Sequence, residues 1–341
     1  MAVMKDVAKL AGVSVSTVSF VLNGMAKEHK VADSTAQKVL HAAKQLGYKI
    51  NSSVGEKNEN KKWQPTVAFF VPMDAAWIDM SEIDAAIQRH MNQSERNYLV
   101  LFCLYEKGHL LEKMSQMNTD IFDSAVISLE SEKDSEDIEQ LDPDGWEVPF
   151  VLYNHLSNRH RSIVCVAEKA VTKAVKMIAS KGYKTIRIFT GSESEKYGDE
   201  YLNLFIRICG EQGVLLGEES FLATENTMIG GAIAARSILN MEQKPELIVC
   251  MNISLAFGAI PLLARNHFLI PRDAELLCFG SSGNAEHIMN YIPSLSMIAL
   301  PVDEITMKAF DLALRLAEEK EELSLHYKCS CELLLNDSFS L

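Results

Sequence analysis

The stretch MKDVAKLAGVSVSTVSFVLNG, residues 4–24, predicts two short helices separated by a tight turn. Apolar side chains recur at helical spacing from Val7 onward, and Gly12 is a residue type that commonly ends a helix. Ser14 precedes a second apolar segment, and serine is a preferred N-cap. We therefore expect a first helix that ends before Gly12 and a second that runs to about Asn23.

Helical periodicity divides this second helix into two faces. At about 100° per residue, Val18, Val21 and Leu22 share one side, which we expect to pack on the helices before and after it. The other side carries Ser16, Ser19, Phe20 and Asn23. In a helix-turn-helix the second helix enters the major groove of DNA, so the sequence predicts that this side faces DNA.

A third helix and a polar linker follow. Asp33 or Ser34 is expected to cap the helix, and its predicted apolar stripe consists of Val39, Leu40, Ala43 and Leu46. After Tyr48 the sequence is polar and lacks hydrophobic periodicity, which predicts a linker. The predicted division is a helix-turn-helix domain over residues 1–48, a linker over 49–65 and a body over 66–341.

In the body, short apolar runs alternate with segments of helical length. TVAFFVP (66–72) and TIRIFTG (185–191) are examples of continuous apolar runs, the pattern of strands buried on both faces. A second series of such units begins with a predicted helix at 167–181. The expected fold class is a small all-α head followed by an α/β body of two doubly wound parallel-sheet lobes, with a cleft between them.

Charge separates the head from the body. Residues 1–62 hold ten lysines, no arginine and five acidic residues, a net charge of +5. The whole chain has a net charge of −13, which leaves −18 for residues 63–341. A basic head on an acidic body predicts a polyanionic partner for the head alone.

Several function classes lack support in the sequence. No Walker loop, dinucleotide fingerprint, nucleophile elbow or metallopeptidase motif is present, so we expect neither an enzyme nor a cofactor. The glycine pair in IGGAIAARS (229–237) could hold an anion, but helix packing is the favoured reading. The seven cysteines are expected to be buried thiols, and His326, Cys329 and Cys331 are too few ligands for zinc. No secretory signal or membrane span is recognised, which predicts a cytoplasmic protein.

The head sequence, together with V-x-x-x-T-x-x-K-V-L-x-A-A-x-x-L-G-Y at 31–48, resembles the LacI-type bacterial transcriptional regulators. Later segments, among them KGYKTIRIFTG (181–191) and PELIVCMN (245–252), extend the resemblance over nearly the whole chain. The resemblance implies a homodimer that binds a pseudo-palindromic operator, most relatives being repressors. It also implies a body of the periplasmic-binding-protein type.

The resemblance assigns roles to residues of the head. Val15, Ser16 and Phe20 match base-reading positions, and Thr17, Ser19 and Asn23 match positions that bond phosphates. Lys30 and Thr35 complete the predicted DNA-binding set. Phe20 stands where the family commonly has arginine, so we expect contact with a thymine methyl in place of a bidentate contact with guanine. The alternative is that Phe20 packs on its own domain or on a partner.

Two departures from the family lower the expected DNA affinity and bending. Val3 replaces a threonine N-cap of the first helix, a loss of roughly 1 kcal/mol. The family's hinge helix carries a leucine that wedges into the minor groove, but residues 50–57 here contain Gly55 and Lys57 and lack that leucine. We therefore expect little hinge helix.

The predicted cleft also departs from the family. Ala167, Tyr201, Ile253 and Gly280 stand where the resemblance implies charged sugar-binding residues, and Asn252 alone fits. Without those groups a buried sugar would keep unpaired hydroxyls, so we expect an effector other than a simple sugar. The candidate effector residues are Asp74, Trp77, Asn154, Tyr197, Tyr201, Asn252 and Ser281.

Alternatives remain for the cleft and for the whole chain. The body could respond to a protein co-regulator, or it could be a structural dimerisation module. Asn252 follows a predicted strand, where asparagine is common in turns. The favoured function is a DNA-binding repressor, and the competing one is a cytoplasmic ligand-binding or interaction module with weakened DNA binding.

Overall fold

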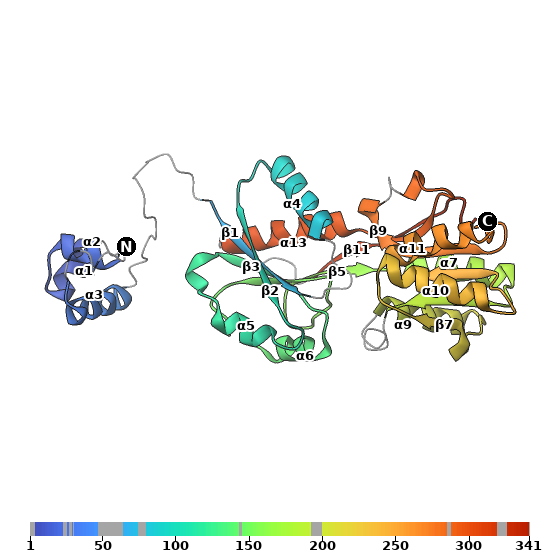
Figure 1. Cartoon of the computed structure of the whole chain (residues 1–341). Coiled ribbons are helices and arrows are strands. Elements are labelled where there is room, and N and C mark those ends of the chain that lie inside the picture. The colour runs from blue at the N-terminus through green and yellow to red at the C-terminus, as the bar shows by residue number, and fades with distance from the viewer. Residues whose placement is uncertain are drawn as a thin grey trace. The chain divides into compact units, whose positions relative to one another are not determined.

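A computed structural model divides the chain into two compact units, Met1–Trp63 and Gln64–Leu341 (Figure 1). The boundary falls within the predicted linker. The structure describes residues 4–22, 26, 29, 31–46, 64–73, 80–142, 145–191, 200–284, 288–318 and 326–340. The predictions made for Val3 and for the hinge at 50–57 lie outside these residues.

The first unit contains the predicted helices α1 (Met4–Ala11), α2 (Val15–Leu22) and α3 (Asp33–Gln45). Gly12 lies between the first two with φ 68°, a left-handed conformation that glycine adopts without steric cost. The side chain of Ser14 accepts a hydrogen bond from the Thr17 amide at 3.1 Å, which confirms the predicted N-cap.

The core of this unit confirms the predicted inner face of α2, because Val18, Val21 and Leu22 are all buried. Two expectations for α3 are wrong. The helix begins at Asp33, so the cap position belongs to Ala32, whose carbonyl accepts the amides of Thr35 and Ala36. Val39 and Ala43 are buried as predicted, whereas Leu40 and Leu46 are exposed.

The second unit begins with a six-stranded sheet in the order β11-β5-β4-β3-β1-β2, and every neighbouring pair is parallel. Alternate residues of β1 face opposite layers: Phe69 packs with α4 and α13, and Phe70 with α5 and α6. The strands are β1 (Thr66–Pro72), β2 (Leu99–Tyr105), β3 (Ser124–Ser128), β4 (Phe150–Tyr153), β5 (Ser162–Val166) and β11 (His326–Ser330). The helices are α4 (Met80–Ser94), α5 (Leu110–Gln116), α6 (Glu132–Gln140) and α13 (Val302–Ala317).

A second six-stranded sheet has the order β12-β10-β9-β8-β6-β7. Its pairs are parallel except for β10 with β12, which are antiparallel. The strands are β6 (Ile186–Thr190), β7 (Phe221–Ala223), β8 (Leu247–Cys250), β9 (Glu275–Ser281), β10 (Ser296–Leu300) and β12 (Glu332–Leu334). The helices α7 (Glu168–Lys181) and α9 (Glu200–Glu211) cover one face, and α10 (Met228–Asn240) and α11 (Ile253–Arg265) cover the other.

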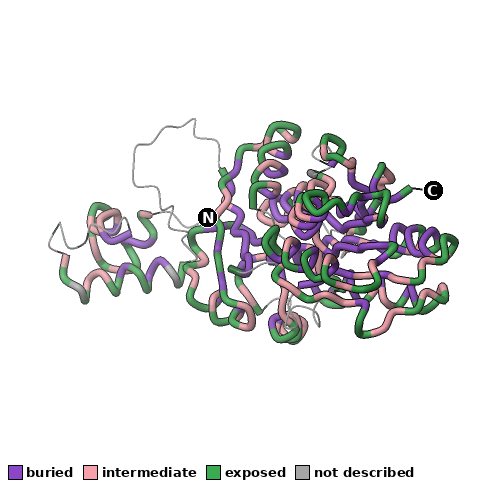
Figure 2. Tube along the Cα trace, turned by 45° about the vertical axis from the view of Figure 1, so that its right-hand side comes forward, coloured by how far each residue is buried: buried purple, intermediate pink, exposed green. Residues whose placement is uncertain are grey.

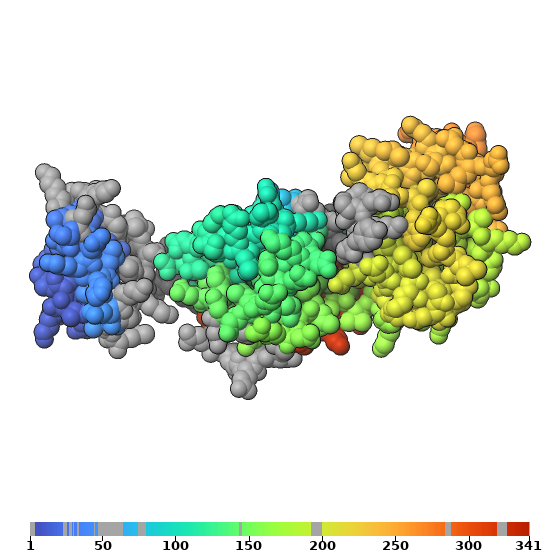
Figure 3. Space-filling view, turned by 90° about the horizontal axis from the view of Figure 1, so that it is seen from below, coloured from blue at the N-terminus to red at the C-terminus, as the bar shows by residue number. Residues whose placement is uncertain are grey.

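These two sheets confirm the predicted fold class of two doubly wound lobes. Buried residues follow the strands of both sheets in Figure 2, and the green and yellow surfaces in Figure 3 belong to the first and second lobes. The glycine pair of α10 serves helix packing, as favoured from the sequence. A Cβ on Gly231 would lie 2.1 Å from the Leu255 carbonyl oxygen, so the two helices approach closely only because glycine stands there.

The chain passes between the lobes at three places within the described residues. It leaves the first sheet after β5 at Val166, returns at Pro301 to form α13, and leaves again at Cys331 between β11 and β12. The first and third crossings run side by side, and the Cys331 amide donates to the Val166 carbonyl at 3.1 Å. Residues from both lobes therefore meet around these crossings.

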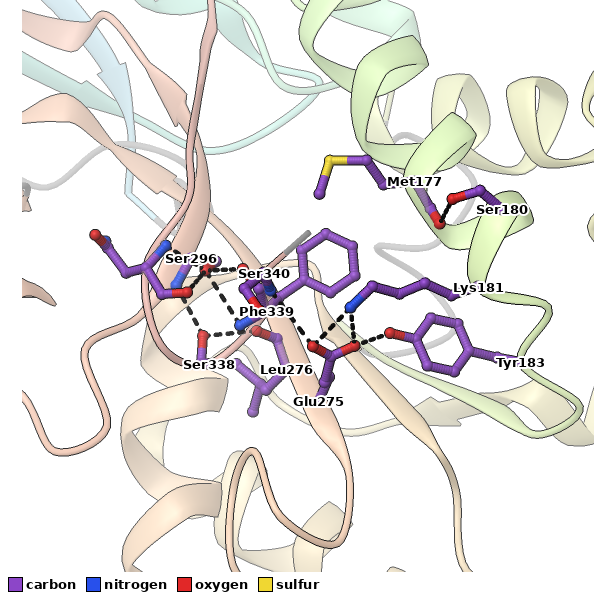
Figure 4. Close-up of polar contacts among 11 residues, drawn as sticks. Met177, Ser180, Lys181, Tyr183, Glu275, Leu276, Ser296, Ser338, Phe339 and Ser340 are labelled. Carbon is purple, nitrogen blue, oxygen red and sulfur yellow. Dashed lines mark hydrogen bonds and ion pairs between the residues drawn. The ribbon is translucent and has the colours of Figure 1, made fainter.

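The C-terminal segment is fixed to the second sheet by buried hydrogen bonds (Figure 4). The Ser338 hydroxyl accepts the Ser296 amide at 2.8 Å and donates to the Leu276 carbonyl at 2.7 Å. Beside it, Lys181 binds the Glu275 carboxylate with its ammonium 2.6 Å from the nearer oxygen, and this ammonium lies 5.0 Å from the centre of the Phe339 ring. Ser338 and Phe339, both fully buried, are thus part of the second lobe's core.

We predict that a buried histidine makes the body sensitive to acid. His90 on α4 shares a 2.9 Å hydrogen bond with the Tyr98 hydroxyl, and burial lowers its pKa below the ordinary 6.5, with Asp311 opposing that shift. Below pH 6.5 the unfolded chain takes up a proton that the folded protein resists, so the free energy of unfolding should decrease as the pH falls. Thermal unfolding at pH 7.5 and 5.5 should show a smaller acid-induced decrease in Tm for His90→Gln. Equal decreases in both proteins would contradict this assignment.

Candidate functional site

The outer face of α2 presents a mixture of apolar and small polar side chains. Ser16 is exposed on the side opposite the buried residues, and Val15, in the first turn and on the same side as Val18, is 44% exposed. The Thr17 hydroxyl lies 2.8 Å from the Ser14 hydroxyl, within the cap. On the face predicted from helical periodicity, Ser16 is exposed and Ser19 and Phe20 are half-buried, and its contact with DNA stays a prediction. Asn23 and Lys30 lie outside the described residues.

The sequence left open whether Phe20 packs on its own domain, and the structure shows one such contact. Its ring stacks on the His29 ring with centroids 3.6 Å apart and planes 11° from parallel. One face of the phenylalanine is therefore covered by the loop between α2 and α3, and the side chain is half-buried. Thr35, at the start of α3, is also half-buried. A base could contact Phe20 only through the ring edge or the opposite ring face.

In the body, two of the predicted effector residues meet beside the crossings. Asn154 follows β4 in the first lobe and has φ 50°, a conformation that asparagine tolerates better than most residues. Its side-chain amide nitrogen donates a hydrogen bond of 3.1 Å to the hydroxyl of Tyr201, which lies at the start of α9. Its side-chain oxygen accepts a hydrogen bond from the Cys165 backbone amide at 2.9 Å. Asn154 thus connects the two lobes and one crossing.

Two further predicted effector residues lie at the carboxyl ends of neighbouring strands of the second sheet. Asn252 follows β8, and its side-chain oxygen caps α11 by accepting the Ser254 amide at 2.8 Å. Ser281 ends β9 and accepts the Gly283 amide at 3.1 Å. Both side chains therefore have local structural roles as acceptors, and the Asn252 amide nitrogen and the Ser281 hydroxyl can still donate to a ligand. Asp74, Trp77 and Tyr197 lie outside the described residues.

The positions that depart from the family's sugar-binding pattern are closely packed. Ala167 is 3% exposed at the start of α7, and Ile253 is 8% exposed. A Cβ on Gly280 would lie 2.6 Å from the Met297 sulfur, so a larger side chain there requires repacking. Charged groups at these positions would be buried in apolar surroundings, an energetically unfavourable placement.

Residues that were not predicted as site residues affect the pKa values of the groups near Asn154 and Tyr201. Burial, assisted by the charge of Cys165, raises the pKa of Tyr201 well above its ordinary value. Burial also lowers the pKa of His155, although Glu200 acts in the opposite direction. The Cys165 sulfur lies 3.0 Å from the Cys331 sulfur. No local pattern in the sequence indicates this pair, because the two cysteines are 166 positions apart.

The histidine–cysteine group considered for metal binding is engaged elsewhere. His326 lies 3.0 Å from the Ser162 hydroxyl, and Cys331 contacts Cys165. All seven cysteines are buried and free, which confirms the expected burial of the thiols. Within the described ranges, no helix is long and apolar enough to cross a membrane.

Comparison with known proteins relates both units to one class of regulator. Residues 3–51 match the lacI family of bacterial regulatory proteins, and residues 175–338 match the periplasmic binding protein-like domain. The HTH-type transcriptional repressor PurR of Vibrio vulnificus (strain CMCP6) is 24% identical over 345 residues, which cover 99% of this chain and 98% of PurR.

Solved structures of LacI-family regulators are similar to this chain. A LacI family transcription regulator from Clostridium acetobutylicum is 25% identical, with a TM-score of 0.70 over 80% of this chain and 99% of that one. The lac repressor dimer bound to operator and the anti-inducer ONPF shares the fold, with 18% identity and a TM-score of 0.68 over 100% of this chain and 99% of that one. With a lacI-family head and a periplasmic-binding-protein-like body in one chain, the protein belongs to the LacI-type family of bacterial transcriptional regulators.

Proposed function

We propose that this LacI-family repressor binds a pseudo-palindromic operator as a homodimer in the cytoplasm, with α2 in the major groove. The observation that carries the proposal is the two-sided character of α2, whose buried side anchors it in the head and whose outer side carries Ser16, Ser19 and Phe20. The head spans residues 1–48, the linker 49–65 and the body 66–341. The net charge of +5 on residues 1–62 supplies attraction to phosphates that the acidic body lacks.

Phe20 gives this readout its particular chemistry. Arginine would select guanine through two hydrogen bonds, whereas the Phe20 ring offers apolar contact with a thymine methyl. The stack on His29 limits the ring's freedom, which favours one defined contact over several. Thr17, Ser19, Asn23, Lys30 and Thr35 would then bind phosphates and fix the register of the helix.

We propose that the body binds an effector richer in apolar or aromatic groups than a simple sugar. Asn154 and Tyr201 from opposite lobes supply one amide and one hydroxyl, and Asn252 supplies a second amide. These neutral groups can orient a planar polar ligand, but they do not provide the carboxylates and guanidinium that a polyol requires. Asp74, Trp77, Tyr197 and Ser281 remain part of this proposal.

Dimerisation is proposed to use one exposed apolar patch on each lobe. On the edge strand β2, Phe102 is 39% exposed and Leu104 is 49% exposed. On α10, Ile229 is 71% exposed and Ile233 is 53% exposed. Contiguous apolar surface of this kind marks interaction sites, and a two-fold operator needs two heads.

The role of Phe20 can be tested by selecting binding sites from random duplex DNA with the full-length protein. Wild type should select thymine at the step that Phe20 faces, Phe20→Arg should select guanine there, and Phe20→Ala should select neither strongly. A change of about 1–3 kcal/mol in discrimination at that single step is expected.

Two controls accompany the selection. His29→Ala removes the stack while it keeps Phe20, so it should retain the thymine preference with lower affinity. Lys30→Ala should weaken all sequences alike and reduce the slope of log K against log salt by about 0.9. Identical preferences for Phe20→Arg and Phe20→Ala would refute base reading. Absence of any selected, salt-dependent site would favour the alternative of a ligand-binding module with weakened DNA binding.

A pair of Asn252 variants separates its capping role from a ligand-binding role. Aspartate is an equally good N-cap, so Asn252→Asp should keep the stability of the free protein, while Asn252→Ala should lose about 1 kcal/mol. Because Asp lacks the amide donor, Asn252→Asp should also lose the thermal shift produced by an effector. Nucleosides, aromatic amino acids and hexoses form the screening set. A hexose that stabilises the wild type would contradict the proposed ligand class.

The dimer surface is testable by measuring mass in solution. Phe102→Glu combined with Ile229→Glu places two charges in the proposed interface, and light scattering should then report a monomer where the wild type is a dimer. Leu215→Glu is the matched control, because Leu215 is 92% exposed and lies outside both patches. A dimer that persists in the double variant would place the interface elsewhere.

A further inference from the structure

Two cysteines lie on the two adjacent crossings between the lobes. Cys165 is the last-but-one residue of β5, and Cys331 lies between β11 and β12. In the parallel pairing of these strands Cys165 is opposite Cys329, so Cys331 follows two residues later. The Cys331 amide is hydrogen-bonded to the Val166 carbonyl at 3.1 Å, which fixes the two backbones next to each other.

The two sulfur atoms are 3.0 Å apart. A disulfide has a sulfur–sulfur distance of about 2.05 Å, so bond formation requires an approach of roughly 1 Å. That approach is within the reach of small rotations of two side chains. The hydrogen bond between the crossings already places the backbones for it.

Hydrogen bonds lower the pKa of Cys165. Its sulfur shares a hydrogen bond with the Cys331 sulfur, in which either thiol can donate, and accepts one from the Tyr201 hydroxyl, and both act against the opposing effect of burial. The same hydrogen bond and burial raise the pKa of Cys331. Because the thiolate is the reactive form of cysteine, Cys165 is the nucleophile of the pair and Cys331 the resolving thiol.

Other cysteines of the chain lack this combination. Cys250 and Cys278 are also opposite each other on neighbouring strands, but both are 0% exposed and burial raises the pKa of each. Cys165 and Cys331 retain 9% and 7% exposure. This opening suits a small oxidant better than a bulky disulfide such as oxidised glutathione.

We propose that Cys165 and Cys331 form a site of reversible oxidative modification, in which a small hydroperoxide converts the two thiols to a disulfide between the crossings. The Cys165 thiolate attacks one peroxide oxygen, the O–O bond breaks, and the sulfur becomes a sulfenic acid as hydroxide leaves and takes up a proton. The Cys331 sulfur then displaces hydroxide from Cys165, and its thiol proton converts that hydroxide to water. Two thiols and one hydrogen peroxide thus give one disulfide and two waters.

The cross-link changes the surroundings of the lobe contact. Once Cys165 is in a disulfide, the Tyr201 hydroxyl loses the free Cys165 sulfur as its acceptor, and Tyr201 is also the residue to which Asn154 donates. The bond also ties the first crossing covalently to the third. Cross-links that form in reducing compartments are commonly transient and regulatory, so we assign this one a role in controlling lobe movement. That role rests on the proposed function, whereas the chemistry of the pair does not.

The test treats the full-length native protein with a few equivalents of hydrogen peroxide, blocks the remaining thiols and maps the peptides by mass spectrometry. The expected product is a peptide pair joined through Cys165 and Cys331, lighter by two hydrogens and restored by dithiothreitol. Cys331→Ser should instead accumulate a sulfenic acid at Cys165 that dimedone traps. Cys329→Ser is the matched control and should cross-link like the wild type.

A second measurement tests whether the Tyr201 hydroxyl makes Cys165 more reactive, which the closeness of the two sulfur atoms alone would not do. The rate at which Cys165 is alkylated should rise at lower pH in the wild type than in Tyr201→Phe, which lacks the donating hydroxyl. Failure to form the Cys165–Cys331 bond, or earlier oxidation of Cys250 and Cys278, would overturn the proposal. DNA binding has no part in either readout, so these results stand apart from the tests of operator recognition.

Discussion

The hydrogen bond from the Cys331 amide to the Val166 carbonyl is the contact on which the arrangement of the body depends. It joins two chain segments that each lead from the first sheet to the second. Because β5 and β11 are parallel neighbours that end together, their continuations enter the second lobe side by side. Asn154 follows β4, the other neighbour of β5, and its side-chain oxygen accepts the Cys165 amide. The proposed effector site and the cysteine pair therefore share one structural origin.

Local features of the sequence were sufficient to predict the head. The cap at Ser14, the turn at Gly12 and the buried side of α2 depend on interactions within a few residues, and all three are confirmed. The exposure of Leu40 and Leu46 could not be predicted from local features. An apolar stripe shows which side chains a helix can bury, and does not show which of them are covered by another helix. The surface available for packing in a three-helix unit is too small to cover both residues.

In the body, continuous apolar strands were recognisable, whereas short or polar strands were not. β7 has three residues, and β11 reads HYKCS, which has no strong strand pattern of its own. Such segments become strands only by pairing with a neighbour that lies far away in the sequence. The approach of Cys165 to Cys331, 166 positions apart, has the same character. Candidate site residues could be named from the sequence, but their partners could not.

The C-terminal segment has a consequence for how the chain is made. The first sheet receives β11 and the second receives β12 and the Ser338 hydrogen bonds from residues that follow all the other strands of both sheets in the chain. Neither lobe can complete its sheet until these residues have been synthesised, whereas the helices of the head precede both sheets in the chain. A nascent chain would therefore carry a DNA-binding head ahead of an unfinished body. Loss of residues 326–340 would remove β11 from the first sheet and β12 from the second, and would therefore impair both lobes together.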